Sequence, residues 1–468
     1  MHIQFCGAAR TVTGSCHLIQ FDNGFRLLLD CGLFQGRQAY VDTWNQSFPF
    51  DPKDIDAVIL SHAHIDHCGR LPKLVKEGFR GFIYCTPATA DLCEHMLLDS
   101  AFIQEKDAEF HNKKRRAENL PPIPPLYTPA DVPPMLGLFK RVGYDETFSV
   151  TDGVTAFLRD AGHILGSASV TVTYQQNGKK RSIGFTGDIG RPARPILKDP
   201  APMDNVDYLL SESTYGNRVH EGTPDDKERL LKIVTETCVK RRGKIVIPAF
   251  SVGRTQEVVY MLDQLHNQKR LPKIKIYVDS PLSTNATNVY RAHPECFDAD
   301  ISKYIQNDPN PFGFNDLTYI TDVNDSKRLN FDPEPCIIVS ASGMAEAGRV
   351  VHHIRNNVEN ANNTVLIVGY CAEGSLGARL RKQPEFVKIF GEEMKVNASV
   401  EIMDSFSAHA DKKEILSFLE PLDRDRIRKL FLVHGDYEEA QLPLEKTMYE
   451  LGYTNVYTPQ MNEKVELI

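Results

Sequence analysis

The chain has 468 residues, of which 41% are hydrophobic and 25% are charged. These proportions are ordinary for globular proteins and exclude a wholly disordered or fibrous chain. The formal net charge of −8 argues against binding nucleic acid through overall charge, although a single basic face is compatible with it.

The sequence shows no membrane or export signal. No stretch approaches the ~18 consecutive apolar residues that a membrane span needs. Residues 1–7 contain neither a basic segment nor a long apolar one, so no signal peptide is predicted. The ten cysteines form no Cys-x-x-Cys pair, which predicts reduced, buried thiols. We therefore expect a cytoplasmic protein without a membrane partner.

Short apolar runs typical of β-strands fill the first part of the sequence. The early runs are separated by glycine-containing turns, as antiparallel strands are. Residues 89–118 predict one long helix, because the basic end at 113–116 suits a helix C-terminus and Pro121 and Pro122 stop it. The expected strands are 2–6, 17–21, 26–30, 57–60, 82–85, 154–158, 169–174 and 181–186.

The pattern changes after the apolar run at 207–211. Helical segments such as 224–240 and 253–266 then alternate with apolar runs, which is typical of parallel βαβ units. These runs lie at 244–248, 274–279, 337–340 and 364–369. We therefore expect an inserted α/β domain at 208–395, between a first segment at 1–207 and a last one at 396–468.

The strongest local signal is a cluster of His62, His64, Asp66 and His67 directly after the strand at 57–60. Residues two apart do not share a helix face, so the cluster must come from a turn at the strand end. A turn there can direct imidazoles at one point and Asp66 and His67 at a second. Two nearby cations suit this arrangement better than a surface histidine cluster does.

Further histidine and acidic residues share one placement, at the end of a β run and mostly beside glycine. They are Asp30, His163, Asp188 and His434. Each alone is most simply explained as a turn residue. Their joint pattern favours a site, because a zinc ion needs more ligands than one loop supplies.

This series of residues resembles the motifs of the metallo-β-lactamase fold, and the region after residue 207 resembles the β-CASP branch. In that branch Glu212 matches motif A, His409 matches motif B and His434 matches motif C. Further matches lie at 248–254, 278–282, 340–344, 372–377 and 405–411. The closest resemblance is to the endonuclease subunit of the eukaryotic pre-mRNA cleavage machinery and to bacterial ribonucleases.

The resemblance implies an α/β fold, a metallo-β-lactamase αββα sandwich with an inserted β-CASP domain. The segments at 1–207 and 396–468 would then form the sandwich, and 208–395 the inserted domain. It also implies two Zn²⁺ ions per chain. One would bind His62, His64 and His163, the other would bind Asp66, His67 and His434, and Asp188 would bridge them. Asp30 would orient a ligand histidine without touching a metal.

The implied chemistry is hydrolysis of phosphodiester bonds. Two zinc ions ~3.5–4 Å apart can activate a shared hydroxide and clamp phosphate oxygens. His409 is the expected proton donor to the leaving 3′ oxygen, and Glu212 would orient it and keep it protonated. With the ligand Asp66 they make up the expected catalytic residues. The products would carry a 3′-hydroxyl and a 5′-phosphate.

Substrate contacts are less strongly indicated. Ser340, Ser342 and Gly343 lie between a strand and an expected helix at 345–357, whose N-terminus suits a phosphate; an ordinary turn explains them equally well. Arg254 could bind a phosphate or pair with a nearby acid. Basic stretches that could follow an RNA backbone are more simply solvated helix faces. They lie at 113–116, 240–244 and 379–382.

Together these features favour a zinc-dependent endoribonuclease that acts on single-stranded RNA in RNA processing or decay. A 5′–3′ exoribonuclease is an open alternative. A DNA nuclease is disfavoured because repair-type members generally lack a motif C histidine, and a small-molecule hydrolase would leave the inserted domain without a role. A non-catalytic scaffold would not need every ligand position filled. A homodimer and a multiprotein RNA-processing complex are both open as assemblies.

Overall fold

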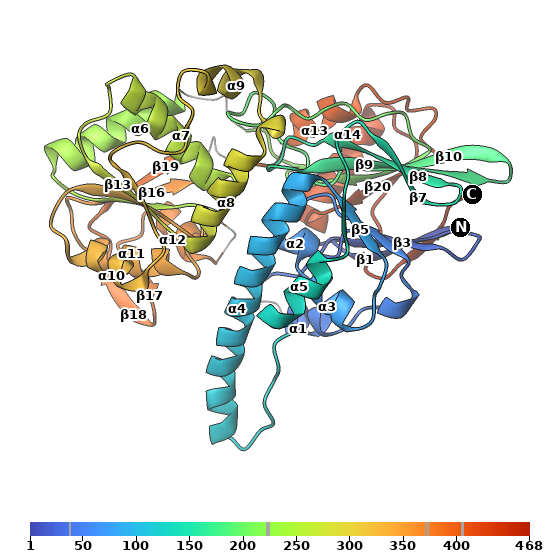
Figure 1. Cartoon of the computed structure of the whole chain (residues 1–468), viewed down its shortest axis with the longest axis horizontal. Helices are drawn as coiled ribbons and strands as arrows, with labels where there is room; N and C mark the ends of the chain where they lie inside the picture. Colours follow the sequence, from blue (N-terminus) through green and yellow to red (C-terminus); the bar gives the residue numbers. More distant parts are fainter. Residues whose placement is uncertain (37–38, 221–224, 370, 372–373, 404–406) are drawn as a thin grey trace. The chain divides into compact units, whose positions relative to one another are not determined.

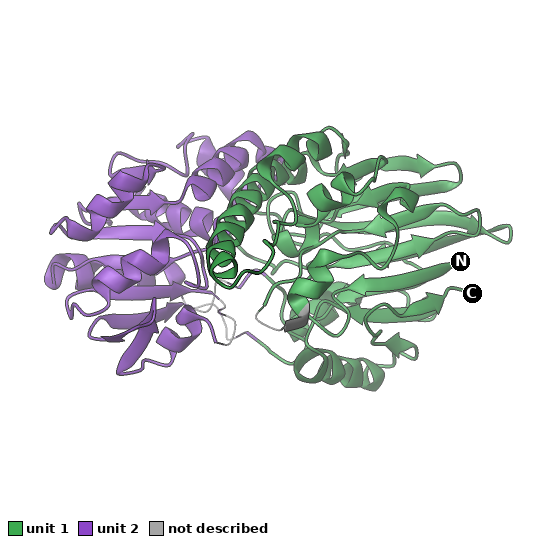
Figure 2. Cartoon of the chain, turned by 90° about the horizontal axis from the view of Figure 1, so that it is seen from below, with its two compact units in different colours: residues 1–219, 409–468 green, residues 220–408 purple. Residues whose placement is uncertain are grey.

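The computed structural model describes the chain except for residues 37–38, 221–224, 370, 372–373 and 404–406. The described residues form two compact units, which are coloured separately in Figure 2. Unit 1 comprises Met1–Val219 and His409–Ile468, and unit 2 comprises His220–Ala408. Each unit has its own β-sheets and hydrophobic core.

Unit 1 contains two seven-stranded mixed sheets (Figure 1). In the first sheet the strand order is β22-β1-β2-β3-β4-β5-β6, with parallel pairing from β3 to β6. Its strands are β1 (His2–Gly7), β2 (Cys16–Gln20), β3 (Arg26–Leu29), β4 (Ala57–Ile59), β5 (Phe82–Cys85), β6 (Phe139–Arg141) and β22 (Lys464–Glu466).

The second sheet has the strand order β21-β20-β11-β10-β9-β8-β7, with parallel pairing from β21 to β10. Its strands are β7 (Thr147–Thr151), β8 (Val154–Asp160), β9 (Ala168–Gln176), β10 (Lys179–Phe185), β11 (Tyr208–Glu212), β20 (Lys429–Val433) and β21 (Val456–Tyr457).

The core of unit 1 lies between the two sheets. Phe5 and Leu29 of the first sheet and Phe185 and Phe431 of the second belong to one buried cluster. Because successive side chains alternate between the faces of a strand, each sheet also has an apolar outer face. Helices cover these outer faces (Figure 1). On the second sheet, for example, α13 and α14 pack against Leu430.

The layers of unit 1 therefore follow the order α, β, β, α, and the expected αββα sandwich is confirmed. One helical layer contains α1 (Ala39–Gln46), α2 (Ile65–Cys68), α3 (Leu71–Lys76), α4 (Pro87–Ala117), α5 (Val132–Leu136) and the short η1 (Pro52–Asp54) and η2 (Pro129–Asp131). The other contains α13 (Lys412–Leu419), η6 (Tyr437–Gln441) and α14 (Leu442–Glu450).

Unit 2 is built on a six-stranded, fully parallel sheet with the order β14-β13-β15-β12-β16-β19. This confirms the parallel βαβ pattern predicted from the sequence. The sheet strands are β12 (Ile245–Pro248), β13 (Lys275–Asp279), β14 (Leu317–Ile320), β15 (Cys336–Ser340), β16 (Thr364–Val368) and β19 (Ser399–Met403). A separate hairpin joins β17 (Phe386–Ile389) and β18 (Glu392–Lys395).

Helices follow most strands of the unit 2 sheet. They are α6 (Asp226–Val234), η3 (Thr235–Lys240), α7 (Arg254–Asn267), α8 (Pro281–Ala292), η4 (Pro294–Cys296), α9 (Ala299–Ile305), α10 (Val323–Phe331), α11 (Arg349–Asn357) and α12 (Leu376–Arg381). No helix in the described part of the chain combines the length and the apolar character that crossing a membrane requires. Each of the ten cysteines is a buried thiol.

The divisions between the units fall at 219/220 and 408/409, whereas the sequence placed the domain boundaries at 207/208 and 395/396. Strand pairing explains the difference. β11 pairs with β10 and β20, so residues 208–212 belong to unit 1. β19 pairs with β16, so residues 399–403 belong to unit 2.

Candidate metal centre

The residues singled out in unit 1 lie at the ends of its strands. Asp30 follows β3, His163 follows β8, Asp188 follows β10 and His434 follows β20. The strands β8, β10 and β20 run in the same direction in the second sheet and end at one edge of it. Asp30 follows β3 in the first sheet, whose parallel neighbour is β4. The cluster at 62–67 follows β4 and continues into α2, which starts at Ile65.

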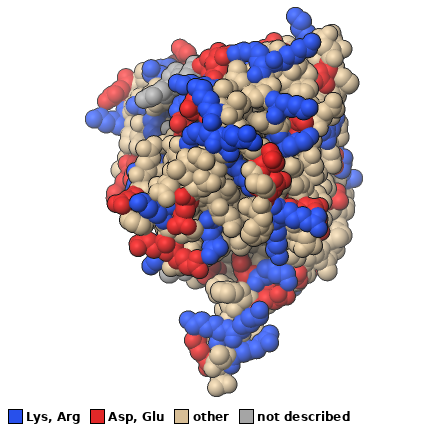
Figure 3. Space-filling view, turned by 90° about the vertical axis from the view of Figure 1, so that its left-hand side faces the viewer, with Lys and Arg blue, Asp and Glu red and all other residues tan. Residues whose placement is uncertain are grey.

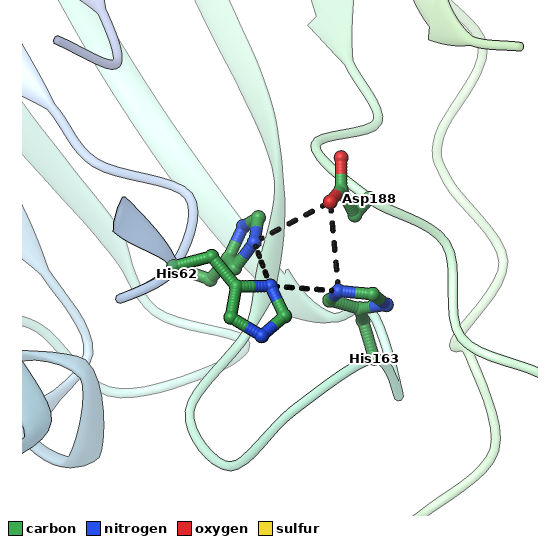
Figure 4. Close-up of side chains that lie close together, drawn as sticks. His62, His163 and Asp188 are labelled. Atoms are coloured by element: carbon green, nitrogen blue, oxygen red, sulfur yellow. Dashed lines mark hydrogen bonds and ion pairs between the residues drawn. The ribbon is translucent and has the colours of Figure 1, made fainter. Parts of the chain in front are cut away.

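A first group of ligand atoms comprises four side chains from three loops (Figure 4). His64 Nδ1 lies 3.1 Å from both His62 Nε2 and His163 Nε2. Asp188 Oδ2 lies 3.5 Å from the same two Nε2 atoms. A tetrahedral ion with bonds of ~2.05 Å would separate its ligand atoms by about 3.3 Å. The spacing of these four atoms therefore fits a single metal ion.

A second group lies next to the first. His67 Nε2 is 3.1 Å from His434 Nε2 and 3.3 Å from Asp188 Oδ1. His434 Nε2 is 3.4 Å from Asp66 Oδ2 and 3.6 Å from Asp188 Oδ1. The two oxygens of Asp188 thus face different groups, Oδ2 the first and Oδ1 the second.

The surroundings of Asp188 require positive charge. Its side chain is 1% exposed, and neither oxygen accepts a hydrogen bond from the described residues. A buried carboxylate without such partners is strongly disfavoured unless a cation compensates it. Burial lowers the pKa of His62 and of His163, and it lowers the pKa of His64 to about 4, which leaves neutral imidazoles with lone pairs. A buried carboxylate beside the three neutral imidazoles of the first group fits a divalent metal ion.

Asp30 holds His67 in place. The buried Asp30 Oδ2 accepts a hydrogen bond from His67 Nδ1 at 2.7 Å and from the hydroxyls of Ser15 and Ser61. Its other oxygen accepts a hydrogen bond from the Ser61 backbone N–H. Burial favours neutral His67, but Asp188 and Asp30 raise its pKa well above the ordinary value. A carboxylate at Nδ1 directs Nε2 into the cluster, the usual arrangement for a metal-binding histidine.

Thr214 holds His434 in place, as Asp30 holds His67. Its Oγ1 lies 3.0 Å from His434 Nδ1. The sequence analysis did not single out Thr214. A threonine two residues beyond Glu212 has no feature that distinguishes it from other turn residues, and only its place beside His434 shows its role.

Glu212 and His409 form a pair beside the cluster. Glu212 is fully buried, its carboxylate accepts a hydrogen bond from Ile189 N–H, and its Oε2 lies 3.2 Å from His409 Nδ1. Burial opposes a charge on His409, but the carboxylates of Glu212 and Asp188 raise its pKa to about 9. This raised pKa favours the protonated imidazole near neutral pH, and His409 Nδ1 lies 3.8 Å from Asp188 Oδ2.

Close backbone contacts position the loops around the cluster. A Cβ at Gly190 would lie 1.9 Å from the Gly162 carbonyl oxygen, so only glycine lets the loops that carry His163 and Asp188 touch. The chain at His409 pairs with Gly190 as an isolated bridge, and Ala410 N–H donates to the Ile189 carbonyl at 2.8 Å. These contacts bring His409 to the cluster from far along the chain.

The expected substrate residues all lie in unit 2. Ser340 is buried and its hydroxyl donates to the Asp279 carbonyl, while the Ser342 hydroxyl donates to the Ala347 carbonyl. Gly343 packs so tightly that an added Cβ would lie 2.6 Å from the Phe250 ring.

One of the substrate interpretations needs correction, and an ion pair is seen for Arg254. The expected helix N-terminus at residue 345 is wrong, because α11 begins at Arg349 after Gly348 at φ 82°. Arg254 is only 5% exposed and forms an ion pair with Glu257, so it pairs with a nearby acid, as the alternative interpretation had it. Residues 372–373 and 405–406, which belong to the segments carrying the resemblance, lie outside the described residues.

Comparisons with known families and proteins agree with this geometry. The family described as "Metallo-beta-lactamase superfamily" matches residues 9–220, and the "Beta-Casp domain" matches 255–380. The "Zn-dependent metallo-hydrolase RNA specificity domain" matches residues 393–459. Each part of the resemblance seen in the sequence thus has a family match.

Individual relatives extend over nearly the whole chain. The chain is 36% identical to "Ribonuclease TTHA0252" of Thermus thermophilus, with 96% of each protein covered. It is 32% identical to "Transcription termination factor FttA" of Methanosarcina mazei, over 95% of this chain and 68% of the relative. It is 30% identical to "Cleavage and polyadenylation specificity factor 73" of Drosophila melanogaster, over 100% of this chain and 65% of the relative. The chain therefore belongs to the β-CASP ribonucleases of the metallo-β-lactamase superfamily, a family of metal-dependent hydrolases.

Proposed function

We propose that this chain is a zinc-dependent endoribonuclease that hydrolyses phosphodiester bonds of single-stranded RNA. The observation that carries the proposal is Asp188, whose two oxygens face two separate ligand groups beside the Glu212–His409 pair. The names of the ribonuclease and cleavage-factor relatives and the RNA specificity match support RNA as the substrate.

The proposed metal ligands are those that the resemblance implied. His62, His64 and His163 would hold one ion, Asp66, His67 and His434 the other, and Asp188 would contact both. Neutral imidazoles and carboxylates suit zinc, and these sets leave room for a water and a phosphate oxygen. Two carboxylates do not neutralise two divalent ions, so the site would attract an anionic phosphodiester.

Two bound ions would supply an activated water and neutralise charge on the phosphate oxygens. The residues of the chain do the rest. Glu212 keeps His409 protonated, and His409 donates its proton to the leaving 3′ oxygen. Asp30 and Thr214 hold His67 and His434 in the orientation that directs Nε2 inward. The products would be a 3′-hydroxyl and a 5′-phosphate.

The test uses one single-stranded RNA, labelled at its 5′ end in one reaction and its 3′ end in another, with DNA of the same sequence beside it. We expect internal RNA fragments from the wild type and none with a chelator or with His409→Ala. His352→Ala is the matched control, because His352 is an exposed histidine of unit 2. Elemental analysis should find two zinc ions per chain.

Other outcomes would exclude the proposal. Release of mononucleotides from the 5′ end alone would show an exoribonuclease instead. Equal cleavage of DNA would show a general nuclease. No cleavage of either polymer despite two bound metal ions would refute nuclease action by the isolated chain. A cytoplasmic location and a homodimer or multiprotein complex stay predictions.

A further inference from the structure

Helix α4 extends far beyond the body of unit 1. With 31 residues it is about 46 Å long, and its C-terminal half projects together with the segment that follows it (Figure 1). We call residues 102–126 the α4 hairpin. Such a long projection has no part in the core, so its surface needs another explanation.

The α4 hairpin is a folded element. The Asn112 side chain donates to the Ile123 carbonyl at 2.9 Å and accepts from the Ile123 N–H at 2.8 Å. Arg115 Nε donates to the Pro121 carbonyl at 2.7 Å, and Tyr127 Oη donates to Ser100 Oγ at 2.9 Å. The return segment is thus fastened along one side of the helix, and the opposite side faces solvent.

The solvent side of α4 interleaves apolar side chains with lysines and two acids. Successive residues of an α-helix are rotated by ~100° about its axis. Because Asn112 faces the return segment, the residues on the opposite side of the helix form the solvent face. Phe110 is 72% exposed and Ile103 is 47% exposed, which is unusual for large apolar side chains on a helix far from the core. Within about 60° of the direction opposite Asn112 lie Ile103, Lys106, Asp107, Phe110, Lys114, Ala117 and Glu118, and Lys113 lies at the margin of this face.

The end of the hairpin is also strongly basic. Residues 110–123 contain four basic residues and one acidic one, a net charge of +3, whereas the whole α4 hairpin contains five basic and four acidic residues, a net charge of +1; the chain as a whole carries −8. Figure 3 shows Lys and Arg gathered on the lower projection. The pairs Lys106–Glu109 and Lys114–Glu118, at 3.0 and 3.9 Å, are exposed and therefore weak.

This combination suits RNA better than a protein partner. A protein interface has few charges at its centre, whereas here Lys106, Lys113 and Lys114 lie within about one helical turn of Phe110. Single-stranded RNA offers bases that stack on an aromatic ring and phosphates that attract lysine and arginine. In a chain of net charge −8, a local basic surface favours the approach of a polyanion.

We propose that the α4 hairpin is a second binding surface for single-stranded RNA, outside the metal centre. The proposal rests on the proposed function. Helix α4 begins beside the metal centre, because the hydroxyls of Thr86 and Thr89 donate to the carbonyl of Gly166 in the loop that carries His163. Phe110 and Lys114 lie about 35–40 Å farther along the helix, which corresponds to roughly 10–12 stacked nucleotides.

The first experiment measures binding of fluorescent RNAs to the metal-loaded His409→Ala protein, so that cleavage does not interfere. The hairpin variant adds Phe110→Ala, Lys113→Ala and Lys114→Ala. The control adds Lys179→Ala and Lys180→Ala, two exposed lysines at the β9–β10 turn. For a 30-nucleotide RNA we expect at least tenfold weaker binding by the hairpin variant only, because loss of one stacked base alone weakens binding roughly 5- to 100-fold.

Salt dependence and RNA length sharpen the test. Loss of two lysine–phosphate contacts should reduce the slope of log K against log salt by about 1.4 for a single strand. In proteins with intact His409, the preference in kcat/KM for a 30-nucleotide over a 6-nucleotide RNA should fall about tenfold with the hairpin variant. Circular dichroism checks that the variant is folded.

Three outcomes separate the proposals. Equal RNA binding by hairpin variant and control would overturn the inference. Equal RNA binding, together with a dimeric wild type and a monomeric hairpin variant, would overturn the inference and show that the hairpin is a protein interface. A wild type that binds long RNA through the hairpin but does not cleave it would support the inference and refute the proposed function.

Discussion

Replacing Glu212 by glutamine tests the role of His409 directly. The glutamine has the same shape, so its carbonyl oxygen still accepts a hydrogen bond from Ile189 N–H and no cavity forms. What is lost is the negative charge 3.2 Å from His409 Nδ1. Because that charge is the largest cause that raises the pKa of His409 to about 9, the variant should have a histidine with an ordinary or lower pKa.

The magnitude follows from the titration of a single acid. His409 must be protonated to act, so activity falls as the pH rises through its pKa. If that pKa drops from about 9 to the ordinary ~6.5, the protonated fraction at pH 7.5 drops from nearly all to about a tenth. Bound cations would lower the pKa of His409 in the wild type and in the variant, because they repel the proton. The pKa of the variant would still be the lower of the two.

The assay is the pH profile of kcat/KM between pH 5.5 and 9.5 with one RNA. We expect the alkaline limb of Glu212→Gln to lie about 2.5 pH units below that of the wild type, with activity recovered at low pH. Glu439→Gln, an exposed acid of the same unit, is the control. Superimposed profiles for Glu212→Gln and the wild type would refute the role of His409 as the acid.

Three further predictions concern metal binding and stability. Asp30→Asn removes no proposed ligand but should weaken metal binding roughly 10–100-fold, because His67 is no longer held in place. Competition with a chelator measures the affinity for the metal, and an unchanged affinity would contradict the orienting role of Asp30. Removal of the metals should lower the melting temperature of unit 1 by roughly 10 °C in calorimetry, because ions at ~1,000 times their Kd add about 4 kcal/mol. Burial raises the pKa of Asp263 to about 7, so its charged form opposes folding at pH values above the pKa of the unfolded chain. Asp263→Asn should therefore stabilise unit 2 by up to about 4 kcal/mol at pH 8 and by little at pH 4. Denaturation curves that respond equally at both pH values would refute this account of Asp263.

The metal cluster was predictable because its residues follow strands whose pattern is local. The strand before His62 and the order of the later motifs can be read from alternating apolar residues and glycine turns. The start of α13 is also marked locally, because Asp411 and Glu414 form a capping box there. The resemblance supplied the assignment of Glu212 and His409, which no local pattern distinguishes.

Features that depend on tertiary pairing could not be predicted. Residues 208–212 look the same in sequence whether they pair within one sheet or start another, and only pairing with β10 and β20 places them in unit 1. Helix α11 begins at Arg349 rather than at the expected residue 345, because Gly348 has a positive φ that a helix would not allow. The projection of the α4 hairpin could not be predicted either, because the length of a helix does not show which part of it packs against the rest of the protein.

The contacts around Tyr215 and Asp411 bear on how such a chain arose. These residues form an isolated bridge, and Lys412 N–H donates to the Arg218 carbonyl at 2.9 Å. The point where the chain leaves unit 1 therefore touches the point where it returns. Sites with adjacent ends accept inserted domains with little strain on the host. A whole domain between them can thus be gained, enlarged or exchanged while the histidines and carboxylates of unit 1 stay in place.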